Sequence, residues 1–210
     1  MILGMTPLST PSPTAVRITE AILAIIADQG LDHATVREVA AVAGVSIGTV
    51  QHHFPTKDAM LAGAFTDVVR QVRARLEAIQ FGDNAHYNAA AVLEEILPLD
   101  QRRRREGRVQ LAFAIRAMHE PILAATQRVV LGDLHYALRT ALAATGAGDS
   151  GQAALAAHAA LAVADGLALH ALSTVDWLPP HTVRDAVNLI LASLTAGSGA
   201  TPPGKTSTGR

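Results

Sequence analysis

The stretch Gly44–Leu61, GVSIGTVQHHFPTKDAML, decides how this chain is interpreted. Ser46 is a favourable residue for capping the start of a helix. Phe54 stands before a proline and is pushed out of helical geometry. The pattern therefore predicts a helix of only about seven residues between two strong boundary signals. Because such a helix is too short to bury a broad apolar face, we expect it to do something other than build a core.

A second short helix is predicted just before this one. Thr35 and Glu38 in the sequence TVRE form a capping-box pattern, so this helix begins at Val36. It ends near Gly44, where glycine supplies the left-handed conformation that a tight turn needs. Two such helices pack across each other at a steep angle, which predicts a helix-turn-helix whose second helix enters the major groove of DNA. The residues expected inside are Val39, Ala40, Val45 and Val50.

The composition favours an all-α protein without a membrane segment. Half of the 210 residues are apolar but only 3% are aromatic, which is typical of closely packed helices rather than of sheet. Cysteine is absent, so disulfides are excluded and a cytoplasmic location is expected. No basic residue precedes Arg17, and no run approaches the roughly 20 consecutive apolar residues that span a bilayer. We therefore expect a soluble protein with no membrane partner.

Capping residues and helix breakers divide the chain into about nine helices, and no alternating strand pattern competes with them. We expect an N-terminal arm without fixed structure over residues 1–13 and a tail of disordered composition over 197–210. Between them, a three-helix domain with the helix-turn-helix covers 14–60 and a helical bundle covers 61–196. The predicted helices cover 14–30, 36–43, 46–54, 56–81, 83–97, 100–118, 121–146, 149–170 and 182–194.

The segment TVREVAAVAGVSIGTVQHHFPTKDAML resembles the signature of the tetracycline-repressor-like (TetR) family of bacterial transcription regulators. The matching features are Thr35, the AGVS turn, Thr49, the HHF ending and Lys57, and the resemblance covers residues 14–65. Two later phrases, RVQLAFAIRAMHEPIL and VADGLALHAL, are similar to the C-terminal domain of the betaine-regulator-like branch. The resemblance implies a homodimeric repressor that binds a double-stranded, palindromic DNA operator and is released by a small-molecule effector.

The resemblance also implies which residues contact DNA. Thr35 and Arg37 would contact phosphates, while His53 and Lys57 would hold the DNA backbone. Helix N-termini and hydroxyl groups bind phosphates, and a glutamine can pair with an adenine edge. The family usually has tyrosine where this chain has Gln51, so an aromatic phosphate contact is either lost or replaced by base reading. The residues of the second short helix that would face the DNA are Ser46, Ile47, Gly48, Thr49, Gln51 and His52.

The charge of the N-terminal segment argues against DNA as the partner. Through Gln80 the chain has six basic and seven acidic residues, and six minus seven leaves −1. DNA-binding domains usually carry a basic footprint. A helical scaffold whose helix-turn-helix binds another protein therefore stays open as an alternative. The motif outweighs this argument, because local arrangement rather than net charge faces the duplex, and we expect a modest salt dependence.

The last two predicted helices carry the expected dimer contact. Both VADGLALHAL and AVNLILASL are strongly apolar, so each must be buried in the core or against a partner. The family resemblance implies a dimer through these two helices. A dimer is also expected because one recognition helix reads too few base pairs for operator specificity.

No pattern of catalytic or metal-binding residues stands out. His52 and His53 are adjacent and point roughly 100° apart on a helix, so they cannot share a metal as an i, i+4 pair does. There is no nucleophile elbow and no phosphate loop. We expect no enzyme, no metal and no cofactor. The run RRRR at 102–105 is interpreted as a solvated helix face, with an anion site as the alternative.

Polar residues within the later apolar helices are the candidates for an effector pocket. Convergent polar groups in an apolar bundle are typical of ligand pockets, although surface exposure or satisfied core positions explain each residue equally well. Few aromatic residues follow the DNA-binding segment, so an aromatic cage for a choline-like cation is not favoured. The candidates are Phe113, Arg116, Met118 and His119 together with His158 and Asp165, which share one helix face.

Overall fold

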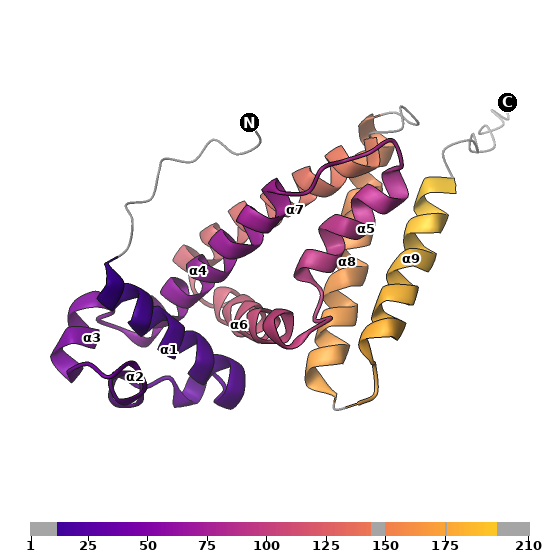
Figure 1. Cartoon of the computed structure of the whole chain (residues 1–210). Helices are drawn as coiled ribbons and strands as arrows, with labels where there is room; N and C mark the ends of the chain where they lie inside the picture. The colour runs from indigo at the N-terminus through magenta and orange to yellow at the C-terminus, as the bar shows by residue number, and fades with distance from the viewer. Residues whose placement is uncertain (1–11, 144–149, 175, 197–210) are drawn as a thin grey trace, which may run out of the picture.

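The computed structural model describes residues 12–143, 150–174 and 176–196, which form an all-α fold (Figure 1). These residues contain nine α-helices, one short 3₁₀ helix and no strand, which confirms the predicted fold class. The elements are α1 (Pro13–Gln29), η1 (Leu31–His33), α2 (Val36–Ala43), α3 (Ile47–His53), α4 (Lys57–Glu77), α5 (Ala85–Ile96), α6 (Gln101–Ala117), α7 (Pro121–Ala143), α8 (Ser150–Ser173) and α9 (Pro180–Ala196).

Most helices begin at the residue that the sequence predicted. The hydroxyl groups of Thr35, Ser46 and Thr56 each accept a hydrogen bond from the backbone N–H three residues further on, at 3.2, 3.1 and 3.0 Å. Asn84 rather than Asp83 caps α5. The capping box at α2 is only half formed, because the backbone N–H of Thr35 donates to the carbonyl of His33. Local side-chain chemistry therefore sets the helix starts around the helix-turn-helix.

Two predicted helix boundaries are wrong. Ser12, not Thr14, caps α1, and Pro13 takes the first helical position, where the missing N–H costs nothing. The helix predicted over 56–81 ends at Glu77. The buried side chain of Asn88 bonds both the N–H and the carbonyl of Gly82, at 3.0 and 2.8 Å, and so holds the chain before α5 in a loop. The predicted boundaries at 146 and 149, and nearly all of both terminal segments, lie outside the described residues.

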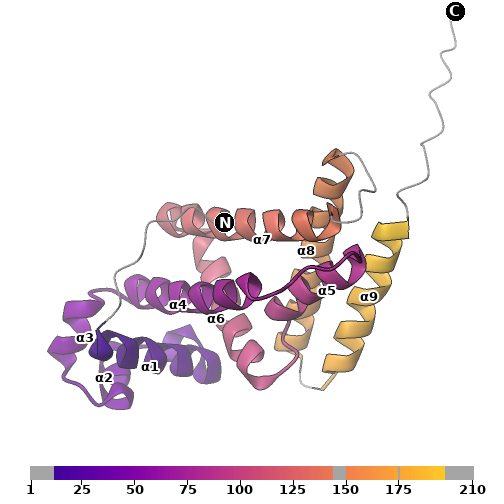
Figure 2. The same ribbon diagram turned by 45° about the horizontal axis from the view of Figure 1, so that its top comes forward.

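Two apolar cores lie at the two ends of the molecule. Helices α1 to α4 surround the first, and α5, α7, α8 and α9 surround the second. Helix α6 belongs to the first core, where its Phe113 stacks on Phe65 of α4 with ring centroids 3.8 Å apart, and it also contacts α5, α7 and α8. Figure 2 shows α4 leading from the helix-turn-helix toward α5, α8 and α9. The division into domains over 14–60 and 61–196 stays a prediction, because the first core includes residues from both sides of it.

Helix α8 is more apolar than the sequence analysis allowed for. Among the described residues, Gly151–Ser173 is long and apolar enough to cross a membrane by length and composition, and 28% of its most apolar window is buried in the chain. The helix packs against α7 and α9. Leu155 and Leu169 on it remain 70% and 45% exposed. A helix that is apolar on most sides and still exposed requires another apolar surface to cover it.

Candidate nucleic-acid interface and ligand cavity

The turn between α2 and α3 is fixed by its own glycine and by a side chain from α1. Gly44 has φ 63° and ψ 41°, the left-handed conformation that the sequence predicted. The guanidinium group of Arg17 donates hydrogen bonds to the carbonyls of Ala43 and Gly44. These carbonyls lie at the end of α2, where no further helical N–H is available to them. Helix α1 thus locks the angle between the two short helices.

Helix α3 has one buried and one exposed face. Val50 of α3 and Val39 of α2 are completely buried, and Ala40 of α2 is only 4% exposed. These values confirm the predicted interior. Val45 packs against the same core and is partly buried. On the opposite face Ile47 is 49% exposed. The residues Gly48, Gln51 and His52 are exposed as well, and Thr49 and His53 are half-buried.

The exit from α3 is held by a close contact with α4. Phe54 ends α3 in an extended conformation, with φ −137° and ψ 89°. A Cβ atom placed on Gly63 of α4 would lie 2.4 Å from Cε1 of the Phe54 ring. Only glycine therefore lets the two segments approach this closely. The recognition helix is consequently positioned from both of its ends.

The remaining predicted DNA contacts lie at the starts of the helices. Thr35 and Ser46 are exposed, and their hydroxyl groups already serve as caps. The hydroxyl groups of Ser46 and Thr49 lie 2.8 Å apart and share a hydrogen bond. Lys57 is exposed at the start of α4, where its ammonium group lies 3.2 Å from the carboxylate of Asp32. Arg37 is exposed on the first turn of α2.

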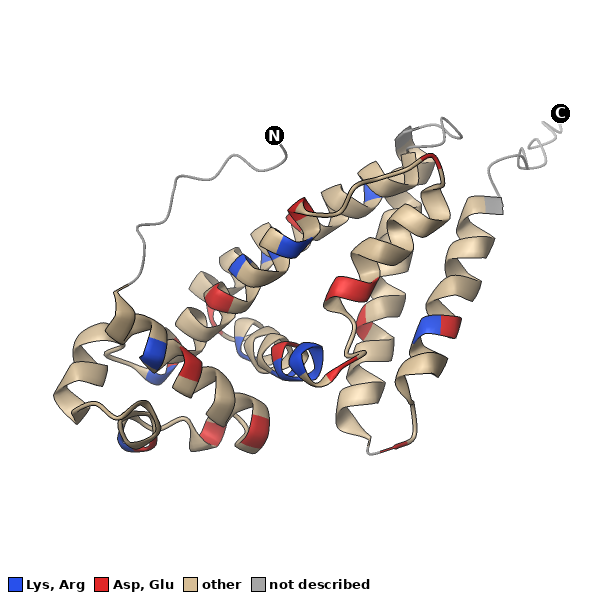
Figure 3. Cartoon of the chain, in the orientation of Figure 1, with Lys and Arg blue, Asp and Glu red and all other residues tan. Residues whose placement is uncertain are grey.

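Basic and acidic residues are interspersed around the helix-turn-helix (Figure 3), and most of the basic side chains have partners within the chain. Helix α3 itself has no Lys, Arg, Asp or Glu. In residues 12–80, Arg37 is the one Lys or Arg side chain with neither an ion pair nor a hydrogen bond to another described residue. The partners of the other basic side chains are the end of α2 for Arg17, Asp32 for Lys57, Asp67 for Arg70, Asp133 for Arg73, and Glu95 and Glu106 for Arg75.

A cavity of about 440 Å³ lies between α4, α5, α6, α7 and α8. This volume falls within the range of roughly 300–1,000 Å³ that is usual for small-molecule sites. Leucine, valine and alanine side chains from these helices supply most of its wall. Two of its lining residues are aromatic, Phe65 on α4 and Phe81 in the loop after it. The wall is thus suited to a ligand with a substantial hydrocarbon part.

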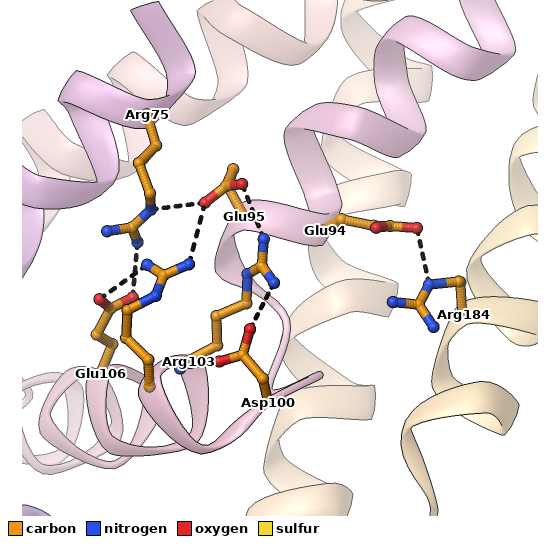
Figure 4. A network of polar contacts seen from close by, with 8 residues as sticks. Arg75, Glu94, Glu95, Asp100, Arg103, Glu106 and Arg184 are labelled. Carbon is orange, nitrogen blue, oxygen red and sulfur yellow. Dashed lines mark hydrogen bonds and ion pairs between the residues drawn. The ribbon is translucent and has the colours of Figure 1, made fainter. Parts of the chain in front are cut away.

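Ion pairs neutralise one side of the cavity wall (Figure 4). The guanidinium group of Arg75 lies 2.6 Å from Glu95 and 2.7 Å from Glu106, and Arg103 lies 2.8 Å from Glu95 and 2.7 Å from Asp100. Burial would raise the pKa of Glu95, but the hydrogen bonds from the two arginines outweigh it and lower the pKa below its ordinary value. Glu95 therefore stays ionised, and both of its oxygens have donors.

Asp165 of α8 differs from Glu95, Glu106 and Asp133 of the wall, which are all paired with arginines. It has no ion pair or hydrogen bond to any described residue. Its surface is open to solvent within the cavity, but the surrounding apolar wall still desolvates the carboxyl group and raises its pKa. On the neighbouring helix α7, the side-chain oxygen of Gln127 is buried and accepts no hydrogen bond from the described residues. The wall therefore has one buried acceptor without a donor, on Gln127, and one carboxylate without a cationic partner, on Asp165, which solvent still reaches.

Of the six residues predicted to bind an effector, Asp165 alone lines this cavity. Phe113 lies behind the wall, stacked on Phe65. Met118 and His158 line, with Asp165, a second and more open groove between α6, α7 and α8. The ring of His158 stacks on that of His135, with centroids 3.8 Å apart.

Two further candidates lie at the end of α6, away from the cavity. His119 is exposed. The guanidinium group of Arg116 lies 2.8 Å from Asp58 of α4 and 3.3 Å from Glu120. Hydrogen bonds from Arg116 lower the pKa of Asp58 below its ordinary value. Arg116 therefore connects the end of α6 to the start of α4, just beyond the recognition helix.

The arginine run at 102–105 is only partly the solvated face that the sequence predicted, since Arg102 and Arg105 are exposed and the two arginines between them are half-buried. Arg103 is only 18% exposed and binds two carboxylates. Arg104 donates to the carbonyl of Ala171 near the end of α8, at 3.2 Å. Three residues beyond the run, Arg108 donates to the carbonyl of Ala27 near the end of α1, at 2.6 Å. These arginines satisfy helix ends and carboxylates within the chain, which also argues against a free anion site there.

The sequence analysis missed most of the residues that form the cavity. Gln127 could have been noticed as an amide within the apolar run of α7. No spacing pattern indicates that Arg73, Glu95 and Glu106 share one wall, because they come from three different helices.

A helix-turn-helix with a solvent-facing second helix at one end, and a helical bundle with a cavity at the other, define a class of DNA-binding regulator. Two family models match the chain. Residues 18–64 match "Bacterial regulatory proteins, tetR family", and residues 86–196 match "BetI-type transcriptional repressor, C-terminal". The chain belongs to the TetR family, with a BetI-type C-terminal region, and is a DNA-binding transcriptional regulator.

Individual relatives agree with this assignment. The chain is 28% identical over 186 residues to the regulator BetI of Cronobacter sakazakii, covering 87% of this chain and 91% of that protein. A solved transcriptional regulator from Rhodococcus sp. RHA1 is 38% identical with a TM-score of 0.81, covering 90% and 99% of the two chains. A regulator from Saccharomonospora viridis, solved with choline, shares the fold with a TM-score of 0.78 at 21% identity, covering 87% and 97%. Several other curated regulators are matched over only 51–60% of their length.

Proposed function

We propose that the protein is a repressor that binds a palindromic operator as a homodimer, with one α3 helix in each of two successive major grooves. The exposed face of α3 carries this proposal. It has no Lys, Arg, Asp or Glu, it begins at a capped N-terminus, and it is held from both ends by Arg17 and Gly63. Such a rigid helix can enter a groove without reordering, and its first turn can approach phosphates.

The ten predicted contact residues keep their proposed roles. Arg37 would supply the free positive charge, since other nearby basic side chains have partners within the chain. Gln51, exposed on α3, would reach a base edge or a phosphate. The remaining contacts would be made by Thr35, Ser46, Ile47, Gly48, Thr49, His52, His53 and Lys57. Because few free cations face the duplex, the slope of affinity with salt concentration should be modest.

The dimer would form through α8 and α9. Leu155 on α8 and Leu189 on α9 are 70% and 69% exposed, and Trp177 between the two helices is 65% exposed. The two helices pack against each other at the far end of the molecule from α3 (Figure 1). A second copy of the same surface would cover these apolar side chains, as closed two-fold dimers do. This explains why α8 is apolar on sides that face away from its own core.

The cavity of the C-terminal bundle would bind the effector. The choline complex of the Saccharomonospora viridis regulator supports a ligand site in this fold. Here α6 lines the cavity with Glu106 and Gln110 and also contacts α1 through Arg108 and α4 through Arg116. A ligand that shifts α6 would therefore change the separation of the two recognition helices. It acts only through different affinities for the two arrangements.

The same relatives support a cytoplasmic protein without catalytic activity, since they are named as transcriptional regulators. The division into a DNA-binding domain over 14–60 and a bundle over 61–196 agrees with the separate matches at 18–64 and 86–196. We propose this division with α6 as the element that couples the two parts.

The experiment that tests this function is selection of bound DNA from a random duplex pool by the purified protein. A two-fold symmetric sequence should be enriched, and its half-sites should lie about one helical turn apart. The mass of the complex should correspond to at least two protein chains. If folded protein enriches no sequence even at low salt, DNA is not the partner, as the near-neutral charge of the N-terminal segment indicates. The helix-turn-helix would then be interpreted as a protein-binding module.

A further inference from the structure

Two acceptors without partners among the described residues lie where the cavity meets the open groove beside it. Asp165 on α8 and Gln127 on α7 line both the cavity and the groove. The side-chain oxygen of Gln127 is buried without a hydrogen-bond donor among the described residues. Asp165 has no cationic partner there, and the apolar wall raises the pKa of its carboxyl group. The helices that carry them pack directly against each other.

Unsatisfied acceptors of this kind are costly for a protein to maintain. A buried polar atom without a partner makes the folded protein less stable than one that is hydrogen-bonded. Asp165 remains open to solvent, and the apolar wall beside it partly desolvates its carboxylate, which disfavours the ionised form. Neither group has an N–H or O–H donor among the described residues, and the carboxylate also has no cationic partner. A single protonated amine supplies the donors and the charge together.

We propose that the cavity binds a hydrophobic primary or secondary amine as its ammonium ion, with its N–H groups donated to Asp165 and to the side-chain oxygen of Gln127. The hydrocarbon part of the ligand packs against the leucine and valine wall that α4, α6 and α7 supply. This inference names the ligand class for the effector site of the proposed function, and it rests on that site being the cavity.

Anionic ligands do not fit this wall. Arg73 is the one basic residue that lines the cavity within the described chain, and its guanidinium group lies 2.7 Å from the carboxylate of Asp133. The acidic residues of the wall outnumber it: they are Glu77, Glu95, Glu106, Asp133 and Asp165. Arginines pair with Glu95, Glu106 and Asp133, which leaves Glu77 and Asp165 without an ion pair among the described residues. An anion would meet these two negative charges without a free cation to balance it.

Quaternary ammonium ions fit less well than amines with N–H groups. Proteins usually hold such ions within cages of several aromatic rings. Of the two aromatic lining residues, Phe65 has its ring stacked on Phe113, and Phe81 is 37% exposed at the edge. A quaternary ion has no N–H to donate, so it would leave Gln127 unsatisfied. The distinction between N–H donors and bare charge is therefore testable.

The test uses four probes with one hydrocarbon chain: octylamine, octanol, octyltrimethylammonium and octanoate. Isothermal titration calorimetry measures their affinities for the full-length protein at neutral pH and low salt. Octylamine should bind about ten- to a hundredfold more tightly than each of the other three, because hydrogen bonds to charged groups are worth that much. Equal affinities for octylamine and octanol, or for octylamine and octyltrimethylammonium, would overturn the proposal. Absence of octylamine binding would overturn it as well.

Variants separate the two acceptors from the general charge of the protein. Asp165→Asn should remove the preference for octylamine over octanol, and Gln127→Leu should remove the preference over octyltrimethylammonium. Asp185→Asn, an exposed position on α9 outside the cavity, removes the same charge and should change neither preference. Unchanged preferences in both cavity variants would contradict the assignment. Thermal unfolding of each variant confirms that it is folded, and operator selection, which needs no ligand, tests the proposed function separately.

Discussion

The helix-turn-helix and the cavity wall differ in how completely their polar groups are satisfied. Around α3, hydroxyl caps, Arg17 and the contact at Gly63 fix each segment, and the free end of α2 is bonded. In the cavity, ion pairs satisfy Glu95 on one side, while Asp165 and Gln127 are left without partners on the other.

This difference fits two functions, which are the recognition of DNA and the response to a ligand. An element whose polar groups are all hydrogen-bonded and whose side chains are closely packed keeps one conformation, which suits recognition of a rigid partner such as DNA. A wall with unsatisfied groups changes its free energy strongly when a ligand satisfies them, which suits a switch. Helix α6 takes part in both regions, through Phe113 in the first core and Glu106 in the cavity wall.

Phe113→Ala should destabilise the protein most. The side chain is completely buried and stacks on Phe65, so its loss leaves a large cavity where α6 meets the first core. Truncation of a buried phenylalanine typically costs about 3–5 kcal/mol. Urea unfolding followed by circular dichroism measures the change. Met118→Ala is the control, because Met118 is 73% exposed and should change stability by less than about 0.5 kcal/mol. A loss below about 1 kcal/mol for Phe113→Ala would show that α6 is not part of that core.

Gln51→Ala and Thr49→Ala should weaken operator binding without loss of fold. The effect should be about 1–3 kcal/mol if Gln51 bonds a base edge, and the preference at one operator position should relax. If Gln51 instead contacts a phosphate, all sequences should weaken together. Fluorescence anisotropy with the selected operator and single-base variants distinguishes the two.

Gln101→Ala is the matched control for this prediction, since Gln101 is exposed at the start of α6, far along the chain from the recognition helix. Its affinity should equal that of the original protein. Retention of full affinity by both α3 variants would remove Thr49 and Gln51 from the interface. Thr49→Ala also breaks the hydroxyl contact with Ser46, so its thermal stability must be compared before the binding loss is interpreted.

How much of each region the sequence could predict follows from the separation of the interacting residues. The cap of α3 joins Ser46 to Thr49, three residues apart, so sequence spacing alone predicts it. The ion pairs of the cavity join Arg73 to Asp133, 60 residues apart, and Arg75 to Glu106, 31 residues apart. No local pattern encodes such pairs, because they depend on how whole helices pack.

The same reason explains the errors over α6. The arginines at 102–105 were interpreted as a solvated face because Asp100 and Glu106 are the partners visible in the nearby sequence. Their partners include Ala171 of α8, 67 residues from Arg104. Arg116 looked like a pocket residue in an apolar helix, whereas its partner Asp58 is 58 residues earlier in the chain. The fold class and the helix-turn-helix were predicted correctly, and the cavity required the tertiary structure.

The smallest effect is expected from Asp165→Asn, and its sign is opposite to that of most core changes. Desolvation raises the pKa of Asp165 in the folded protein, while in the unfolded chain it stays near 3.8. As the pH rises from about 3.8 through the folded pKa, the unfolded chain ionises first and is favoured, so stability falls over this interval. The asparagine variant escapes this loss and should have the higher Tm at neutral pH.

Glu95→Gln is the matched comparison for Asp165→Asn, because the opposite change in Tm is expected. Burial would raise the pKa of Glu95, but hydrogen bonds from Arg75 and Arg103 lower it below 4.5, so its contribution to stability is present above pH 4.5 and lost as the pH falls through the folded pKa. Glu95→Gln should therefore lower the Tm at neutral pH, where Asp165→Asn raises it. Melting curves of both variants against the original protein from pH 3.5 to 8 measure the two differences. A lower Tm for Asp165→Asn at neutral pH would mean that the carboxylate has a stabilising partner, and the contrast between the satisfied and unsatisfied sides of the cavity would be lost.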